Sequence, residues 1–130
     1  MQKNSYNTAN RGSYAETMID RTCQYYQSNH IALMEKREVP IKILKRINET
    51  TIMGKLMSKS SVDYFGCYQM KHFEFEVKQT NERNFSLDMI KSHQLAFLKE
   101  CVSYGVESFL VIYFGVYDKF YKVSTIWILN

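Results

Sequence analysis

The sequence has few residues that interrupt regular structure and few that could cross-link it. One proline and five glycines in 130 residues argue against a loop-rich or fibrous protein. The three cysteines, Cys23, Cys67 and Cys101, are widely spaced and form no CxxC pair. We therefore expect buried, unreactive thiols and a cytoplasmic location, without a disulfide framework or a cysteine zinc site.

Long apolar segments and phosphate-binding loops are also missing. No apolar run approaches the ~20 residues that span a bilayer, so we expect no membrane partner. The opening residues, MQKNSYNTANRG, lack the apolar core of a signal peptide. Neither GxGxxG nor GxxxxGKS occurs, which counts against dinucleotide or NTP binding.

The residues that are present predict one globular domain. Hydrophobic residues make up 45% of the chain and aromatic residues 15%, enough to build a core at this length. Residues 1–12 are polar and without periodicity, so we expect a flexible arm there and a single domain over 13–130.

The hydrophobic periodicity predicts alternating helices and strands. Ser13 and Glu16 have the spacing of a capping box, which predicts a first helix ending near Gln27. A second helix is expected over 87–104, with Leu87 facing inward and Gly105 as its stop. Strands are expected at 31–38, 41–47, 61–68, 71–80, 107–114 and 120–123. This order predicts an α/β fold in which helices flank a mixed β-sheet.

Basic residues are concentrated in one segment of the chain. Seven basic and two acidic residues between positions 36 and 59 give that segment a charge of +5, against +4 for the whole chain. A solvated surface could look like this, but a polyanionic partner explains it better. The polar stretch 48–60 is expected to be an exposed loop or projection. The seven basic residues are Lys36, Arg37, Lys42, Lys45, Arg46, Lys55 and Lys59.

The segment FEFEVKQT, residues 73–80, alternates apolar and charged side chains as a strand does. Its charged side, which carries Glu76 and Lys78, could simply face water. A two-residue turn at 69–70 would, however, place Asp63 directly opposite Glu76, with Cβ atoms about 4.5–5.5 Å apart. Two such carboxylates repel each other unless a cation lies between them, and Mg²⁺ suits oxygen ligands at this spacing.

Asp63 followed by Glu76-Val77-Lys78 resembles the PD-(D/E)xK nuclease signature, and the whole chain most resembles the RecU family of Holliday-junction resolvases. The similarity covers residues 10 to 128. It is carried by Asn10-Arg11-Gly12 with Glu16, by Pro40-Ile41-Lys42-Ile43, by Asp63-Tyr64 with Gly66 and Tyr68, by Phe75 to Lys78 with Thr80, and by Phe85, Leu87, His93 and Gln94.

The resemblance implies a restriction-endonuclease-like core with a projecting basic stalk over about 42–60. It implies a homodimer that nicks four-way DNA junctions during recombination and repair, with recombination proteins as possible partners. Asp63 and Glu76 would bind Mg²⁺ or Mn²⁺, with the Val77 carbonyl as a further ligand. Lys78 would orient the attacking water, Glu16 would approach the metal from the first helix, and Arg11 would join the seven basic residues in binding DNA.

The chain departs from the family pattern at several points. Val62 stands where a threonine is usual and Gln79 where an acidic residue is common. The stalk is several residues shorter, and a Gly- and Lys/Arg-rich C-terminal segment is missing. Two alternatives therefore stay open: a nuclease of this superfamily that acts on another DNA structure, and a junction-binding protein with little catalysis. Glu16, likewise, could serve only as a capping residue.

Overall fold

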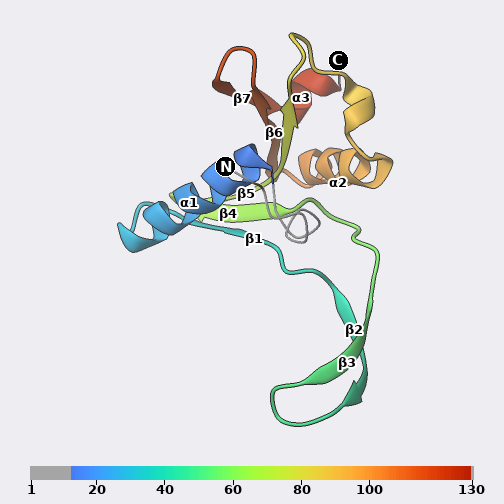
Figure 1. The fold of residues 1–130 in the computed structure, drawn as a ribbon. Helices are drawn as coiled ribbons and strands as arrows, with labels where there is room; N and C mark the ends of the chain where they lie inside the picture. Colours follow the sequence, from blue (N-terminus) through green and yellow to red (C-terminus); the bar gives the residue numbers. More distant parts are fainter. Residues whose placement is uncertain (1–12, 130) are drawn as a thin grey trace, which may run out of the picture.

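The structure is a computed structural model that describes residues 13–129 (Figure 1). Its main sheet has five strands in the order β1-β4-β5-β6-β7. Strands β5 and β6 are parallel and all other neighbours are antiparallel, so the expected mixed sheet is confirmed. The strands are β1 (Leu33–Lys36), β4 (Tyr64–Tyr68), β5 (Lys71–Thr80), β6 (Glu107–Phe114) and β7 (Lys119–Ser124).

Helices cover both faces of this sheet, as expected. Helix α1 (Tyr14–Ser28) lies on one face, and α2 (Ser92–Ser103) with the short α3 (Thr125–Ile128) lies on the other (Figure 1). Side chains of β6 alternate between two cores, with Phe109 in the α1 core and Leu110 in the α2 core. This double burial explains the nearly continuous apolar run of β6. No helix within residues 13–129 is long and apolar enough to cross a membrane.

The start of α1 and the end of α2 lie where local sequence signals place them. The Ser13 side chain accepts a hydrogen bond from the Glu16 N–H at 3.2 Å and caps α1. Gly105, with φ of 77°, follows the end of α2. The N–H groups of Gly105 and Val106 donate to the carbonyls of Val102 and Cys101, which is the Schellman pattern.

The second predicted helix is wrong in its first turn. Residues Leu87–Met89 form a separate 3₁₀-helix, and Ile90 and Lys91 are extended before α2 begins. The Gln94 side chain accepts a hydrogen bond from the Lys91 N–H, which supplies a new helix start at that point. Leu87, expected to face inward, is therefore 51% exposed.

A two-stranded hairpin extends away from the sheet (Figure 1). Among residues 13–129, strands β2 (Ile41–Arg46) and β3 (Ile52–Leu56) pair only with each other, and we call them the β2–β3 hairpin. The stretch 48–60, expected to be an exposed loop or projection, is exposed over β3 and forms part of this hairpin, although the sequence did not predict the strand itself. The tip is closed by the Asn48 side chain, whose oxygen accepts hydrogen bonds from the N–H groups of Thr50 and Thr51.

Candidate active site

The β4–β5 hairpin brings Asp63 and Glu76 together. Its turn residues, Gln69 and Met70, both have positive φ, as a tight two-residue hairpin turn requires. Tyr68 pairs with Lys71 and Tyr64 with Phe75, so Asp63, directly before β4, lies opposite Glu76. This is the register expected from the sequence, although the turn carries no Asn-Gly or Asp-Gly signal.

Contacts around this pair join four charged side chains. The Asp63 N–H donates to Glu76 Oε2 at 3.0 Å. Lys78 Nζ lies 3.7 Å from Glu76 Oε1, and Lys59 Nζ lies 2.7 Å from Asp63 Oδ1. Two carboxylates and two ammonium groups therefore meet at one end of the hairpin.

The charged side of β5 is buried. Glu76 is 2% exposed and Glu74 is 5% exposed, because both lie on the face of the sheet that α2 covers. Burial, and after it the charge of Asp63, raise the pKa of Glu76 to about 7. The Asp63 N–H and Lys78 oppose this rise, whereas the charge of Glu16 adds to it. Burial beside a second carboxylate thus makes the charged form of Glu76 unfavourable despite the nearby lysine.

Glu16 lies in the first turn of α1, and its carboxylate binds Lys36 at 3.0 Å. Its negative charge contributes to the raised pKa of Glu76. Within residues 13–129, no group of three or more Asp, Glu, His or Cys side chains is arranged to hold a metal. Metal-binding roles for Asp63, Glu76 and Glu16 therefore stay predictions.

Arg37, predicted as a DNA-binding residue, is engaged inside the protein. Its guanidinium binds both carboxylate oxygens of Glu74, with Nη2 2.6 Å from Oε1. It also donates to the Val62 carbonyl at 3.0 Å. These contacts occupy most of its donors, and a further contact of Arg37 with DNA stays a prediction. Glu74 was not among the residues predicted for the site, although the Glu-x-Glu spacing puts it on the same side of β5 as Glu76.

The two unusual residues next to the site both have structural partners. Gln79 Oε1 accepts a hydrogen bond from the Ala15 N–H at 2.9 Å, which satisfies one free donor at the start of α1. Val62 is fully buried in the α2 core with Leu98 and Leu110. Gln79 thus provides a hydrogen-bond acceptor, as the acidic residue common at this position would. Val62 provides apolar packing where a threonine is usual.

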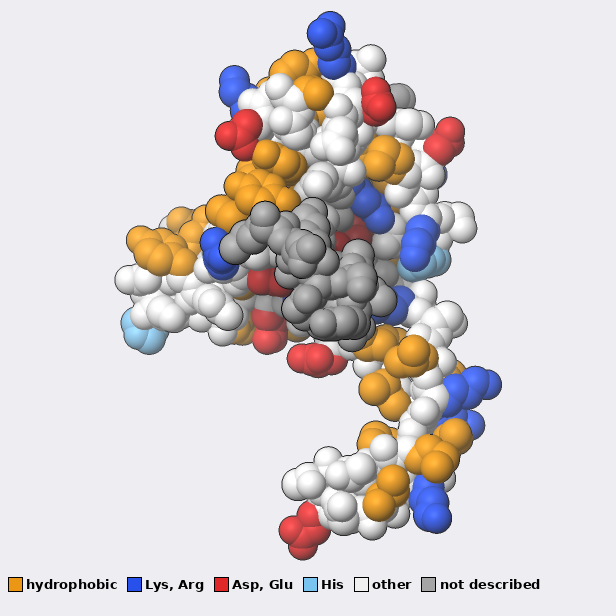
Figure 2. Space-filling model, viewed as in Figure 1, with side chains coloured by type: hydrophobic (Ala, Val, Ile, Leu, Met, Phe, Trp, Pro, Cys, Tyr) orange, Lys and Arg blue, Asp and Glu red, His pale blue; other side chains and the backbone are white. Residues whose placement is uncertain are grey.

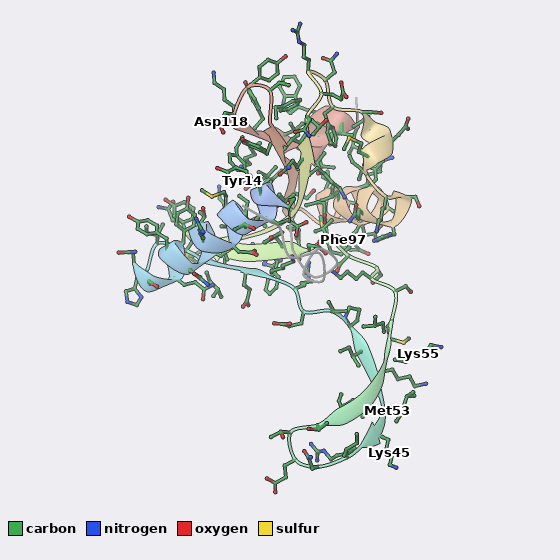
Figure 3. The ribbon with its side chains drawn as sticks, in the orientation of Figure 1. Tyr14, Lys45, Met53, Lys55, Phe97 and Asp118 are labelled. Atoms are coloured by element: carbon green, nitrogen blue, oxygen red, sulfur yellow. The ribbon has the colours of Figure 1, made fainter. Side chains whose placement is uncertain are left out.

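The remaining predicted DNA-binding residues fall into two groups. Lys36 and Lys59 pair with Glu16 and Asp63 where the β2–β3 hairpin joins the core. The others lie on the hairpin itself, and Figure 2 shows lysine and arginine side chains gathered along one of its edges. Figure 3 labels two of them, Lys45 and Lys55. The hairpin residues are Lys42, Lys45, Arg46 and Lys55. Arg11 and the predicted arm over 1–12 lie outside the described residues.

Comparison with known proteins identifies the family. Residues 10–130 match the family model described as "RecU: Recombination protein U". The chain belongs to the RecU family. The match includes both carboxylates of the site and the whole β2–β3 hairpin, so RecU membership rests on nearly the entire chain.

Individual relatives agree with this assignment. The chain is 34% identical over 124 residues to a Holliday junction resolvase RecU of Ureaplasma parvum serovar 3, covering 95% of this chain and 72% of that protein. It is 32% identical over 130 residues to the Holliday junction resolvase RecU of Bacillus cytotoxicus, covering 95% of this chain and 64% of the relative. The chain thus spans about two thirds of the length of these RecU proteins.

A solved structure supports the fold. The Hjc protein of Archaeoglobus fulgidus, described as a Holliday junction resolvase, superimposes with a TM-score of 0.53 over 84% of this chain and 76% of that one. Sequence identity is only 9%, so the likeness concerns the fold alone. The expected restriction-endonuclease-like core of this RecU-family chain is thereby confirmed.

Proposed function

We propose that this chain is a metal-dependent endonuclease that resolves four-way DNA junctions by hydrolysing phosphodiester bonds. One observation carries the proposal: Asp63 faces Glu76 across the β4–β5 hairpin, with Lys78 on the same strand, in a chain of the RecU family. Its relatives are named Holliday junction resolvase. The proposal includes a cytoplasmic homodimer acting in recombination and repair, with other recombination proteins as partners.

Asp63 and Glu76 would hold Mg²⁺, or Mn²⁺ in its place, with the Val77 carbonyl as a further ligand. The donor set fits such an ion, because Mg²⁺ binds one or two carboxylates and completes its shell with water and phosphate oxygens. The raised pKa of Glu76 supports this, since a cation between the two groups would remove the repulsion from Asp63. A bound ion would polarise the scissile phosphate and generate hydroxide from water at neutral pH.

Lys78 would act on the attacking water and on the charge that develops at phosphorus. Its ammonium lies 3.7 Å from Glu76 Oε1 and is mostly buried, so it is held beside the carboxylates by the strand itself. An ammonium fixed at this place would hold the water by a hydrogen bond and offset negative charge on the transferring phosphoryl oxygens. Glu16, at the start of α1, would approach the same centre directly or through water.

The β2–β3 hairpin would enter the junction, and its basic residues would bind phosphates. Lys42 and Lys55 are directly opposite each other in the register, where like charges repel unless an anion neutralises them. Lys45 and Arg46 extend the charged edge toward the tip. Lys36 and Lys59 would bind phosphates at the base of the hairpin, and Arg11 would add a contact from the N-terminal arm.

A labelled four-way junction with Mg²⁺ tests the proposal. We expect symmetrical paired nicks from the unchanged protein, and a loss of roughly a thousandfold or more in cleavage rate for Asp63→Asn and for Glu76→Gln. Both variants should still bind the junction. Glu100→Gln, which removes an exposed carboxylate of α2, is the matched control and should cleave normally.

The same assay separates the alternatives. Equal cutting of linear duplex would indicate a nuclease of this superfamily with another substrate. Tight junction binding without nicks in Mg²⁺ or Mn²⁺ would indicate a binding protein with little catalysis. Full cleavage by Asp63→Asn would contradict the assigned site.

A further inference from the structure

Arg37 connects both ends of the β2–β3 hairpin to strand β5. It lies directly after β1, where the chain leaves the sheet to form the hairpin. Its backbone N–H donates to the Asp63 carbonyl at 2.6 Å, where the chain returns to the sheet. Its side chain donates to the Val62 carbonyl and binds Glu74 of β5. One residue therefore holds the departing and the returning segment against the same strand.

The guanidinium is fixed in its plane as well as in its position. Its central carbon lies 4.7 Å from the centre of the Phe65 ring and 5.7 Å from that of Phe97, a residue of α2 labelled in Figure 3. Glu74, its partner, is 5% exposed and also lies 3.0 Å from Nε2 of His72. Bidentate pairing and stacking together suit the planar arginine fork, and a lysine cannot reproduce both.

These contacts reach the peptide unit that carries the catalytic aspartate. The carbonyl of Val62 and the N–H of Asp63 belong to the same planar unit and point in opposite directions. Arg37 Nη1 binds the carbonyl at 3.0 Å, and Glu76 Oε2 accepts from the N–H at 3.0 Å. The peptide unit is therefore held on one side by Arg37, which also pairs with Glu74. On the other side it is held by Glu76, which belongs to the proposed metal-binding centre.

We infer that Arg37 is a positioning residue: held by Glu74, it fixes the Val62–Asp63 peptide unit and so sets how the Asp63 carboxylate meets Glu76. This inference rests on the proposed nuclease function. It assigns Arg37 a role in the arrangement of the site that does not depend on a contact with DNA. Glu74 acts through Arg37 and touches neither substrate nor metal.

The first test is Arg37→Lys, which keeps the positive charge but cannot bind Glu74 and the Val62 carbonyl with one planar group. We expect kcat to fall about 10- to 100-fold, as is usual when a group that orients a metal ligand is lost. The KM for the junction and metal-free junction binding should be unchanged. Mn²⁺ binding to the protein alone, measured by calorimetry, should weaken by a similar factor.

A second variant guards against misfolding caused by an unpaired buried charge. Arg37→Met with Glu74→Leu replaces the whole pair by apolar groups, a change that buried ion pairs often tolerate. We expect a folded protein with the same loss in kcat and Mn²⁺ affinity. The matched control is Lys122→Met with Glu107→Leu, which removes an ion pair with Nζ–Oε1 of 2.8 Å that is exposed and lies on β6 and β7. It should retain both properties.

Amide hydrogen exchange separates this inference from the proposed function. In Arg37→Lys, the Asp63 N–H should exchange at least about tenfold faster, because the peptide unit is released on one side. Faster exchange in a chain whose unchanged form neither cleaves junctions nor binds Mn²⁺ would contradict only the nuclease function. Normal kcat, Mn²⁺ affinity and exchange in a folded variant would overturn the role of Arg37. Unfolding of both variants would also overturn it, since Arg37 would then serve general stability.

Discussion

Glu76 is a carboxylate that the fold buries beside a second carboxylate and a lysine. At 2% exposure it has lost almost all contact with water, and Asp63 adds a repulsive charge. One hydrogen bond from the Asp63 N–H and one ammonium, Lys78, only partly compensate for this. The folded protein thus keeps an unfavourable charge at a site where a divalent cation would be stabilising.

The burial of Glu76 predicts an unusual dependence of stability on pH. The pKa rises from its ordinary 4.5 to about 7, and a pKa unit is worth about 1.4 kcal/mol, so the shift amounts to roughly 3 kcal/mol. Between these two pH values the folded state retains a proton that the unfolded state releases. The contribution of Glu76 to stability therefore falls as pH rises through this window and is most unfavourable above about pH 7.

Glu76→Gln should accordingly raise the melting temperature at pH 8 more than at pH 5, in the presence of a chelator. At pH 5 the glutamate is already mostly neutral when folded, so the substitution changes little. Calorimetric melting of both proteins at the two pH values measures the difference. An equal effect at both would contradict the raised pKa. Glu100→Gln, on the exposed side of α2, serves as the control without a pH-dependent gain.

Among the elements, the β2–β3 hairpin stands out because it exposes large apolar side chains beside its basic ones. Within the part of the chain that the structure describes, its strands have only each other as partners, so apolar residues such as Ile43 and Leu56 are exposed together with the lysines. Met53, labelled in Figure 3 between the two lysines, is also exposed. Opposed lysines at 42 and 55 destabilise the pair in isolation. A phosphate bound between them would reverse that effect.

The salt dependence of junction binding tests whether the hairpin binds DNA. Lys42→Gln with Lys55→Gln should weaken binding and reduce the slope of log K against log salt by about 0.9 for each lost phosphate contact. Lys119→Gln with Lys122→Gln removes the same charge from β7. This control should leave the slope nearly unchanged. Equal slopes in the hairpin variant and the unchanged protein would mean that the basic edge is only solvated.

At the scale of the whole molecule, the chain carries one Asp63–Glu76 pair, whereas paired nicks in a four-way junction need two catalytic sites. A homodimer is the simplest way to supply the second site. We expect light scattering after size exclusion to give a molar mass of twice the 15.4 kDa of the chain, at protein concentrations at which junctions are cleaved. A mass of one chain under these conditions would contradict the prediction.

Mixed dimers extend this test. Unchanged protein mixed with an excess of Asp63→Asn, after exchange of subunits, should nick one strand of the junction and leave the opposite strand intact. If the yield of paired nicks instead follows the fraction of unchanged protein in the mixture, one subunit makes both cuts.

Short-range sequence patterns were enough to predict most of the elements and the register of the β4–β5 hairpin. Alternation in residues 73–80 specifies a strand, and two residues between the strands place Asp63 opposite Glu76, because side chains repeat with a period of two. The capping serine of α1 and the glycine that ends α2 are equally local signals. Each depends on residues only a few positions apart, which is why it could be predicted.

Packing between distant segments sets which charges are buried and which partners they find. Strand β3 has a weak pattern of its own and exists through its pairing with β2. The sequence left open whether the charged side of β5 faces water, and in the structure Glu74 and Glu76 on that side are buried. Arg37 pairs with Glu74 at a separation of 37 residues, and nothing local distinguishes it from Lys36 beside it. Burial and ion pairing depend on contacts between distant segments, so they follow from the packing of the layers and not from periodicity.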